Sequence, residues 1–425
     1  MIAGGSAVLL ASAWPLSEIL GDAADARRPW RQGPFGPVRR DPAGILDLPE
    51  GFTYRIVDRS GDRMDDGYVV PGRPDAMAVF PLADGSLALM RNHENPAGIA
   101  MLGAFEGREP PAEAWDSSGM GGVTRVVLDP TTLERRSSNL VLAGTTLNCA
   151  GGPSPWGWLS CEETFTDRHG YVFIADPTAD RVALPQRVPA FGRFRHEAAC
   201  VEPSTLVTYL SEDREDGCLY RFVPRSFDTP FEGELSALAI RGRRGADTAA
   251  GLDAGDRLEI AWVPVGAPDS GADDLRHRAA AAGAATFKRG EGLWRSEDAR
   301  GHGVLHLSCT TGGPAAAGQI FRVEPEADGG ELVLLAQSRS QDDFDMPDNL
   351  TVSPGGQLFF CEDGHGRNYV RGLDHDGGVF DFARNARSRS EITGVCFSPD
   401  GAAMFLALQG DGLTLSVQGP FAPRA

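Results

Sequence analysis

Apolar and polar residues alternate in short runs along most of this chain, and glycine, proline or aspartate bounds each run. Such alternation is typical of β-strands with one buried face, and it is clear at Leu87 and Leu89 and again at Leu358 and Phe360. Five of these segments align on a proline that lies in a turn between two strands. The aligned prolines are Pro81, Pro155, Pro203, Pro354 and Pro399. A sixth, looser copy opens at Glu291 and reaches its strand at residues 303–313.

A second hairpin follows each aligned segment, for example in residues 121–142 and 318–335. The chain therefore divides into six units of four short strands, which predicts an all-β fold, a six-bladed β-propeller. Residues 52–58 are a spare strand, and we expect them to complete the last blade and close the ring. A single domain then covers residues 45–420, with a partly helical insertion at residues 226–302 over one face.

The residue that opens each aligned segment is predicted to face the central channel of the propeller. These residues are Asp75, Cys149, Glu197, Glu291, Asp348 and Thr393. They bring four carboxylates and one thiol into a small volume, and like charges this close cannot all stay ionised without compensation. Bound cations are the simpler explanation. The alternative is that these side chains cap the strand starts and accept hydrogen bonds from backbone N–H groups.

Further polar side chains follow the turn of each segment and predict a second layer beside this ring. They are Asn92, Glu94, Glu163, Glu212, Asp213 and Asp363. Carboxylate oxygens in this number suit Ca²⁺, whereas a thiolate among carboxylates suits a softer or redox-active ion such as iron. We therefore expect a mixed cluster of Ca²⁺ and a softer or redox-active ion such as iron. The alternative for each acidic pair is a solvated surface.

Two basic side chains accompany the acidic ring. Arg289 lies two residues before Glu291, so both side chains would project from the same face of an extended strand. A guanidinium beside metal ions can hold two oxygens of a phosphoryl group, and the alternative is a surface arginine paired with an acid. His196 adjoins Glu197 and should point to the opposite side, where it would donate a hydrogen bond to a ligand rather than bind metal.

Composition narrows the range of partners. The chain has 425 residues, with 40 Lys and Arg against 59 Asp and Glu and a formal net charge of −19, which argues against nucleic-acid binding. Residues 1–25 include an apolar stretch that is either an export signal or a tail, and no later segment reaches the ~20 apolar residues of a membrane span. The seven cysteines contain no C-x-x-C spacing, so they indicate neither a disulfide framework nor a zinc ribbon.

Several segments resemble the PhoX-type alkaline phosphatase family. They are LPEGFTYRIV, MRNHENP, NCAGGPSPWGWLSCEETF, GRFRHEA, EDREDGCLYRFVP, FKRGEGLW, MPDNLTVSPGG and TGVCFSPDG, and they run from about residue 45 to residue 420. The resemblance implies a monomeric β-propeller that scavenges phosphate after twin-arginine export to the periplasm or outside the cell, although residues 1–25 lack the arginine pair. It also implies iron and calcium ions joined by an oxo bridge, with a cysteine among the iron ligands.

The same resemblance assigns roles to individual residues. It implies Cys149, Glu197 and Glu291 as ligands of the iron cluster, Glu163 and Asp348 as calcium ligands, and Arg289 as the phosphate contact. The predicted function is therefore metal-dependent hydrolysis of small phosphate esters, specifically phosphomonoesters, in the propeller channel.

Two other functions stay open. A calcium-dependent lactonase also uses axial carboxylates in a six-bladed propeller, but neither a thiol nor an arginine is useful at a hard-ion lactone site. The second alternative is an exported, non-enzymatic propeller that binds partners and holds calcium for structural purposes.

Overall fold

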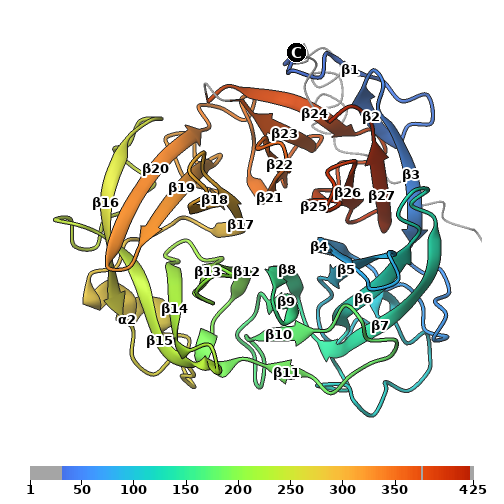
Figure 1. Ribbon diagram of the computed structural model, residues 1–425, viewed down its shortest axis with the longest axis horizontal. Helices are drawn as coiled ribbons and strands as arrows, with labels where there is room; N and C mark the ends of the chain where they lie inside the picture. Colours follow the sequence, from blue (N-terminus) through green and yellow to red (C-terminus); the bar gives the residue numbers. More distant parts are fainter. Residues whose placement is uncertain (1–30, 375–376, 422–425) are drawn as a thin grey trace, which may run out of the picture.

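The computed structural model describes residues 31–374 and 377–421, so residues 1–25, the predicted export signal or tail, lie outside the described residues. Within this range the regular secondary structure is almost entirely β-strand. Its helical elements are α2 (Leu275–Ala282) and the 3-10 turns η1 (Ala100–Leu102) and η2 (Pro189–Phe191). None of the described helices has the length and hydrophobicity needed to cross a membrane. The strands are arranged around a central axis as a β-propeller, as the sequence predicts (Figure 1).

Six strands line this axis, and each begins a group of antiparallel strands that runs outward. The first three groups are β4 (Pro74–Pro81), β5 (Leu87–His93), β6 (Gly121–Leu128) and β7 (Arg135–Thr145); β8 (Asn148–Ser154), β9 (Gly157–Glu162), β10 (Val172–Ala175) and β11 (Gln186–Arg187); and β12 (His196–Val201), β13 (Thr208–Glu212), β14 (Leu219–Ser226) and β15 (Thr229–Ile240). The other three are β17 (Gly290–Glu297), β18 (Gly303–Cys309), β19 (Gln319–Glu326) and β20 (Gly329–Gln337); β21 (Pro347–Val352), β22 (Leu358–Glu362), β23 (Tyr369–Leu373) and β24 (Val379–Asn385); and β25 (Ile392–Phe397), β26 (Ala403–Leu408), β27 (Leu413–Gln418) and β3 (Thr53–Arg59).

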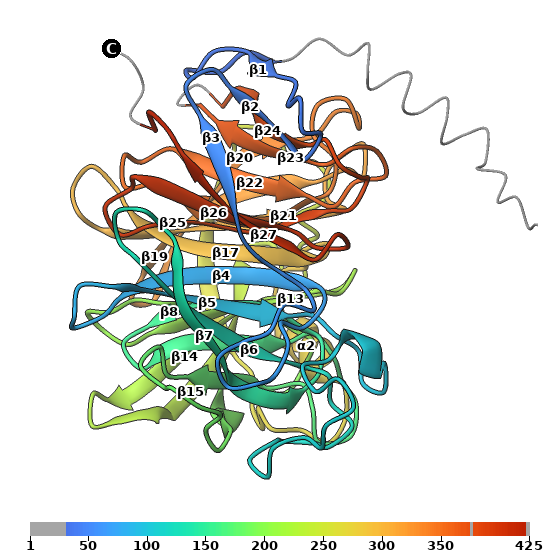
Figure 2. The same cartoon turned by 90° about the vertical axis from the view of Figure 1, so that its right-hand side faces the viewer.

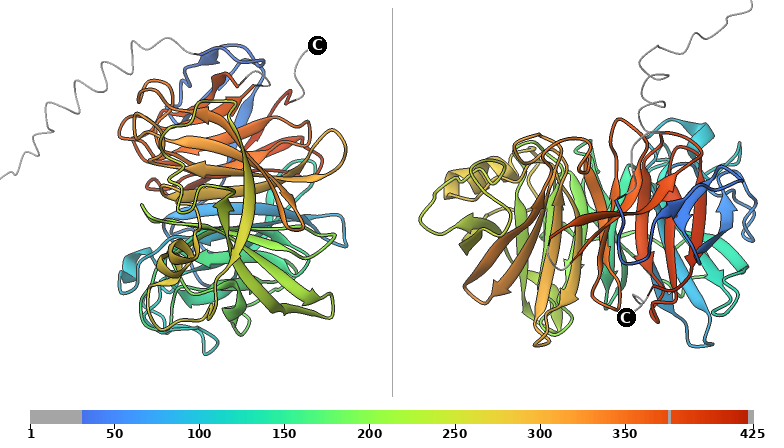
Figure 3. Two further views of the ribbon diagram at one scale, coloured as in Figure 1. Left: turned by 90° about the vertical axis from the view of Figure 1, so that its left-hand side faces the viewer. Right: turned by 90° about the horizontal axis from the view of Figure 1, so that it is seen from above.

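Additional strands extend this plan at two places. β16 (Arg257–Pro264) pairs with both β15 and β20, and it thereby joins the third and fourth groups into one nine-stranded sheet. β2 (Leu46–Pro49) and β1 (Val38–Arg39) continue the fifth group at its outer edge. The segment 226–302 contains β15, then β16 and α2, and finally β17, so blade strands lie near both of its ends and only the part between them is an excursion. α2 and η1 lie on the same face of the ring in the edge-on views (Figures 2 and 3).

Strands from opposite ends of the chain close the ring. β3 pairs with β27 in a register that runs from Thr53 opposite Gln418 to Arg59 opposite Leu413, so the spare strand completes the sixth group as expected. Arg91 on the neighbouring β5 is fully buried and donates hydrogen bonds to Asp58 on β3 at 2.5 and 3.1 Å. A buried guanidinium is tolerated only when it is paired, so this contact holds the first and sixth groups together.

Apolar side chains fill the space between neighbouring groups. One cluster surrounds Trp158, which is 1% exposed, and extends to Phe173, Phe287 and Phe321. A second cluster stacks phenylalanines of the fifth and sixth groups, including Phe382. Because burying apolar area is the main favourable term in folding, this packing fixes the six innermost strands and positions the side chains at their starts.

Candidate metal centre

Each innermost strand has a β-bulge where the sequence predicts a residue facing the axis. The pairing of β4 with β5, for example, jumps from Pro74 to Met77 and skips Asp75. The other five innermost strands show the same jump at the equivalent position. In five of the six the skipped residues include the predicted acid or thiol, whereas β25 pairs Thr393 just before the jump. A bulge takes residues out of the ladder and re-aims their side chains, so the fold directs these groups into the channel.

In each group, a backbone hydrogen bond joins the residue before the first strand to the residue after the second strand. The side chains of these residues form two further circles around the axis. The carbonyl oxygen of Arg73, two residues before Asp75, accepts a hydrogen bond from the N–H of Glu94 at 3.0 Å. The equivalent bonds, 2.8 to 3.3 Å long, join Glu163 to Leu147, Asp213 to Arg195, Thr310 to Arg289, Asp363 to Met346 and Gln409 to Glu391. The side chains just before the first strand and just after the second strand of each group are therefore held at the same end of the channel.

These circles of residues surround a cavity of about 190 Å³. Its lining includes eight carboxylates, one thiol, one hydroxyl and three guanidinium groups. They are Asp75, Glu94, Glu163, Asp213, Glu291, Asp348, Asp363 and Glu391, then Cys149, Thr310, Arg73, Arg195 and Arg289. The structure thus brings together most of the residues singled out from the sequence, although their roles as ligands stay predictions.

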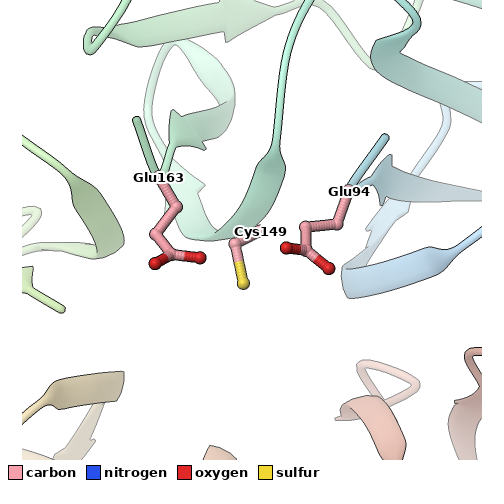
Figure 4. Close-up of side chains that lie close together, drawn as sticks. All are labelled: Glu94, Cys149 and Glu163. Carbon is pink, nitrogen blue, oxygen red and sulfur yellow. The ribbon is translucent and has the colours of Figure 1, made fainter. Parts of the chain in front are cut away.

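Two groups of side chains in this region have donor atoms close enough to share one ion each. Glu94, Cys149 and Glu163 form the first triad, with one atom of each within 4.8 Å of the others. The three side chains come from separate chain segments and point into the open centre (Figure 4). Glu197, Glu291 and Asp348 form the second triad under the same 4.8 Å limit. One triad contains a thiol and the other only carboxylates, and both are donor sets that can hold a metal ion.

Glu197 is the side chain that most clearly requires a ligand. Both of its carboxylate oxygens are buried and have no hydrogen-bond partner among the described residues. Burial raises the pKa of this carboxyl well above its usual range, and the nearby carboxylates of Glu291 and Asp348 raise it further. A buried carboxylate without a partner is costly, and a cation removes that cost. The alternative of a strand cap holds in part for Asp75, which accepts the N–H of Ala76 at 2.7 Å, but not for Glu197.

Burial and neighbouring negative charges also disfavour the ionised forms of the other acids of the cavity. Burial first, and neighbouring carboxylates second, raise pKa values well above the usual carboxyl range for Asp75, Glu163, Glu291, Asp348 and Glu391. Burial also raises the pKa of the Cys149 thiol, with Asp75 and Glu197 contributing. Asp363 is more accessible, and its pKa rises to about 6. The donor set fits cations, because these groups could then release their protons without leaving unpaired negative charge.

The three arginines of the cavity each pair with an acid of a triad. Arg289 donates to Glu291 at 2.8 Å and forms a two-pronged contact with Asp213 at 2.8 and 3.0 Å. Arg195 donates to Glu163, and Arg73 donates to Glu94. Arg289 precedes β17 with a left-handed backbone, φ +50°, rather than the extended backbone expected from the sequence. Its side chain still reaches Glu291, as the two-residue spacing predicted.

Five of the candidate residues do not line the cavity. Glu197 belongs to the second triad but is not among the lining residues, and Thr393, predicted to face the channel, stays paired with Ala407 in its ladder. Strand alternation directs the other three elsewhere. Asn92 holds the backbone of the thiol strand, donating to the carbonyl oxygens of Cys149 and Ala150 at 3.1 and 2.7 Å. His196 lies buried against Phe194 and contacts the carbonyl oxygen of Gly192 at 3.0 Å, and burial lowers its pKa to about 3. Glu212 accepts the hydroxyl of Tyr220 at 2.8 Å, and burial raises its pKa to about 7.

Sequence reasoning missed four polar residues of the cavity or its rim, namely Arg73, Arg195, Thr310 and Glu391. A signal for the arginines was present: Arg73, Arg195 and Arg289 each lie two residues before an axial acid. Thr310 and Glu391 carry no such signal, because single polar residues at strand ends are common on any surface.

Comparisons with known proteins show the family and the fold. The family model described as alkaline phosphatase PhoX matches residues 33–412. The solved structure of Pseudomonas fluorescens PhoX in complex with vanadate, a transition state analogue, has a similar fold, with 17% identity, a TM-score of 0.68, and 92% of this chain and 98% of that chain covered.

Weaker likenesses involve other enzymes. A gluconolactonase from Xanthomonas campestris matches at 12% identity and TM-score 0.43, covering 93% of this chain and 99% of that chain. Virginiamycin B lyase from Staphylococcus aureus matches at 11% identity and TM-score 0.41, covering 86% and 99%. A comparison with curated proteins finds no match.

Proposed function

The chain belongs to the alkaline phosphatase PhoX family and is a phosphoric monoester hydrolase, and we propose that it acts through a mixed cluster of Fe³⁺ and Ca²⁺ in the axial cavity. The observation that carries this proposal is the pair of triads that meet at one polar cavity beside Arg289. The first triad contains Cys149, and the second contains Glu197, which has no hydrogen-bond partner among the described residues. The substrates of the enzyme are small phosphate esters, which suit a cavity of about 190 Å³.

The family resemblance, together with the donor type of Cys149, suggests which side chains would hold each metal. Cys149, as a soft thiolate, would bind iron, together with Glu197 and Glu291. Glu163 and Asp348 offer hard oxygens and would serve calcium. When bound, these ions supply positive charge to the phosphoryl oxygens and lower the pKa of a water nucleophile.

The protein's own residues orient the substrate. Arg289 is fixed by Asp213 and Glu291 and remains 27% exposed, so its free edge faces the cavity. Two-pronged contact with phosphoryl oxygens would align the ester and neutralise the charge that develops in the transition state. The vanadate held by Pseudomonas fluorescens PhoX, described as a transition state analogue, supports such binding in this family.

The family also suggests where the enzyme acts. We propose export to the periplasm or the exterior and action as a monomer, with phosphate released from esters too charged to cross a membrane. The strongly acidic chain, at −19, offers no basis for nucleic-acid binding.

Elemental analysis of protein purified without chelators, combined with a panel of phosphomonoesters and lactones, tests this function. We expect iron and calcium together with phosphomonoester hydrolysis that chelation abolishes. Calcium alone with lactone hydrolysis would instead identify a lactonase. Absence of both activities in metal-replete protein would favour a propeller that only binds partners.

A further inference from the structure

Two arginines of the cavity share one carboxylate. Arg195 precedes β12 and Arg289 precedes β17, and both occupy the position two residues before an axial glutamate. Asp213, the residue that follows β13, lies between them. Arg289 contacts both of its oxygens at 2.8 and 3.0 Å, and Nη2 of Arg195 lies 3.8 Å from Oδ2.

The remaining partner of each arginine belongs to a metal triad. Arg195 donates to Glu163 of the first triad, and Arg289 donates to Glu291 of the second. Metal ions bound to Glu163 and Glu291 would share the negative charge that otherwise neutralises Arg195 and Arg289. Among the residues that the structure describes, Asp213 would then be the one carboxylate in contact with both guanidinium groups that no triad shares, which leaves one positive charge in excess at this side of the cavity.

Both arginines also have donors to spare. Nη1 of Arg289, together with Nε and Nη1 of Arg195, makes no hydrogen bond to any described residue, although each guanidinium carries five N–H donors. The side chains are 27% and 32% exposed, and both line the cavity. Paired guanidiniums with unused donors are suited to an anion that has several equivalent oxygens.

We propose that Arg195 is a second phosphate-binding residue, that Asp213 is a positioning residue that aligns Arg195 with Arg289, and that this pair selects monoesters over diesters. The inference rests on the proposed function. A phosphomonoester presents a dianion with three terminal oxygens, enough for two guanidiniums in addition to metal ions. A phosphodiester has one charge and two terminal oxygens, so it cannot bind both guanidinium groups in addition to the metal ions. It therefore gains less from Arg195.

Substitutions at Arg195 test this directly, with p-nitrophenyl phosphate and bis(p-nitrophenyl) phosphate as substrates and inorganic phosphate as inhibitor. Arg195→Ala should lower kcat/KM for the monoester about 100-fold, the usual effect of removing one charged transition-state donor. Its effect on the diester should stay within about 10-fold, and inhibition by phosphate should weaken. Arg195→Lys should keep the contact with Glu163 but lose the two-pronged contact with phosphate. Its ratio of monoester to diester activity should therefore also fall below that of the parent.

Two further variants complete the design. Asp213→Asn keeps the side-chain shape but removes the shared charge, so it should lower the monoester to diester ratio with iron and calcium content unchanged. Arg214→Ala is the control for net charge, because Arg214 follows Asp213 in the chain but pairs with Asp273 outside the cavity. It should leave the ratio at the parent value.

The outcomes separate this inference from the proposed function. Arg289→Ala could weaken phosphate inhibition while Arg195→Ala leaves both this inhibition and the monoester to diester ratio unchanged. Arg195 would then not bind phosphate, and the phosphatase function would stand. Loss of metal from both Arg195→Ala and Arg195→Lys also overturns the inference, because Arg195 would then serve only to hold Glu163. A metal-replete parent that neither hydrolyses the monoester nor binds phosphate would refute the proposed function itself.

Discussion

Removal of the metal ions should destabilise the protein more at pH 8 than at pH 5. The eight lining carboxylates and Glu197 make nine acids against three guanidiniums, a formal charge of −6 when all are ionised. Burial and mutual repulsion raise the pKa values of most of these acids in the metal-free folded protein. The folded state then binds more protons than the unfolded chain between the ordinary carboxyl pKa and the raised one, so its stability falls as pH rises through that window.

The size of the effect can be worked from Asp363. Its pKa rises from 3.8 to about 6, and at 1.36 kcal/mol per pKa unit this corresponds to about 3 kcal/mol lost as pH rises from about 4 to 6. An unfolding entropy of ~2.1 cal/mol/K per residue gives roughly 0.9 kcal/mol/K for a chain of this length, so Asp363 alone should lower Tm by about 3 °C. The more deeply buried acids add to this loss over a wider pH range.

Thermal unfolding of metal-loaded and chelated protein at pH 5, 6, 7 and 8 measures the effect. In loaded protein the ions replace the protons and stabilise the folded state by mass action, and they bind more tightly as the ligands deprotonate. The gap in Tm between the two forms should therefore widen from pH 5 to pH 7, by about 1.5 °C from the part of the Asp363 window above pH 5 and further from the more deeply buried acids. Asp363→Asn should reduce the widening. A gap that stays constant or narrows with pH would refute the reasoning, because the cavity acids would then be neutralised by something other than bound cations.

Two further predictions concern the thiol and the closure of the ring. Cys149→Ser exchanges a soft thiolate for a poor neutral donor, so elemental analysis should show loss of iron with part of the calcium retained, whereas Glu163→Gln should chiefly lower calcium; full iron occupancy in Cys149→Ser would make Cys149 a buried core residue only. Asp58→Asn leaves Arg91 buried without its charged partner, and it should cost about 3–5 kcal/mol, or roughly 3–5 °C in Tm, in a thermal melt. The double variant Asp58→Leu with Arg91→Met should recover much of that loss, and a single variant as stable as the parent would contradict the role of this pair in closing the ring.

Local pattern was sufficient for the fold and for five of the six positions of the first ring, since Thr393 stays in its ladder and does not line the cavity. Strand alternation and turn residues are short-range signals, and their repetition identified six units before any contact was known. The proline register then selected Asp75, Cys149, Glu197 and Asp348, because equivalent positions of a propeller meet at its axis. Glu291 followed from a weaker copy, and the structure places it in the second triad.

Local pattern does not predict which member of an adjacent acidic pair faces the channel. Glu212 and Asp213 are adjacent in sequence, yet one is directed to Tyr220 and the other to the cavity. Which member of a pair faces the channel depends on where each strand leaves its ladder. A one-residue difference in that position exchanges the two faces, and local propensity does not set it.

The sequence by itself therefore determined the strand order, the closing strand and the residue types available at the axis, since these follow from periodicity and spacing along the chain. Only the tertiary structure decided the bulges that aim the axial acids inward, the left-handed turn that carries Arg289 to Asp213, and the meeting of Arg195 with Glu163 from another group. The physical reason is that these features depend on packing between groups of strands that lie far apart in the chain. That packing decides which charged side chains are buried together, and the pattern along a single strand carries no information about it.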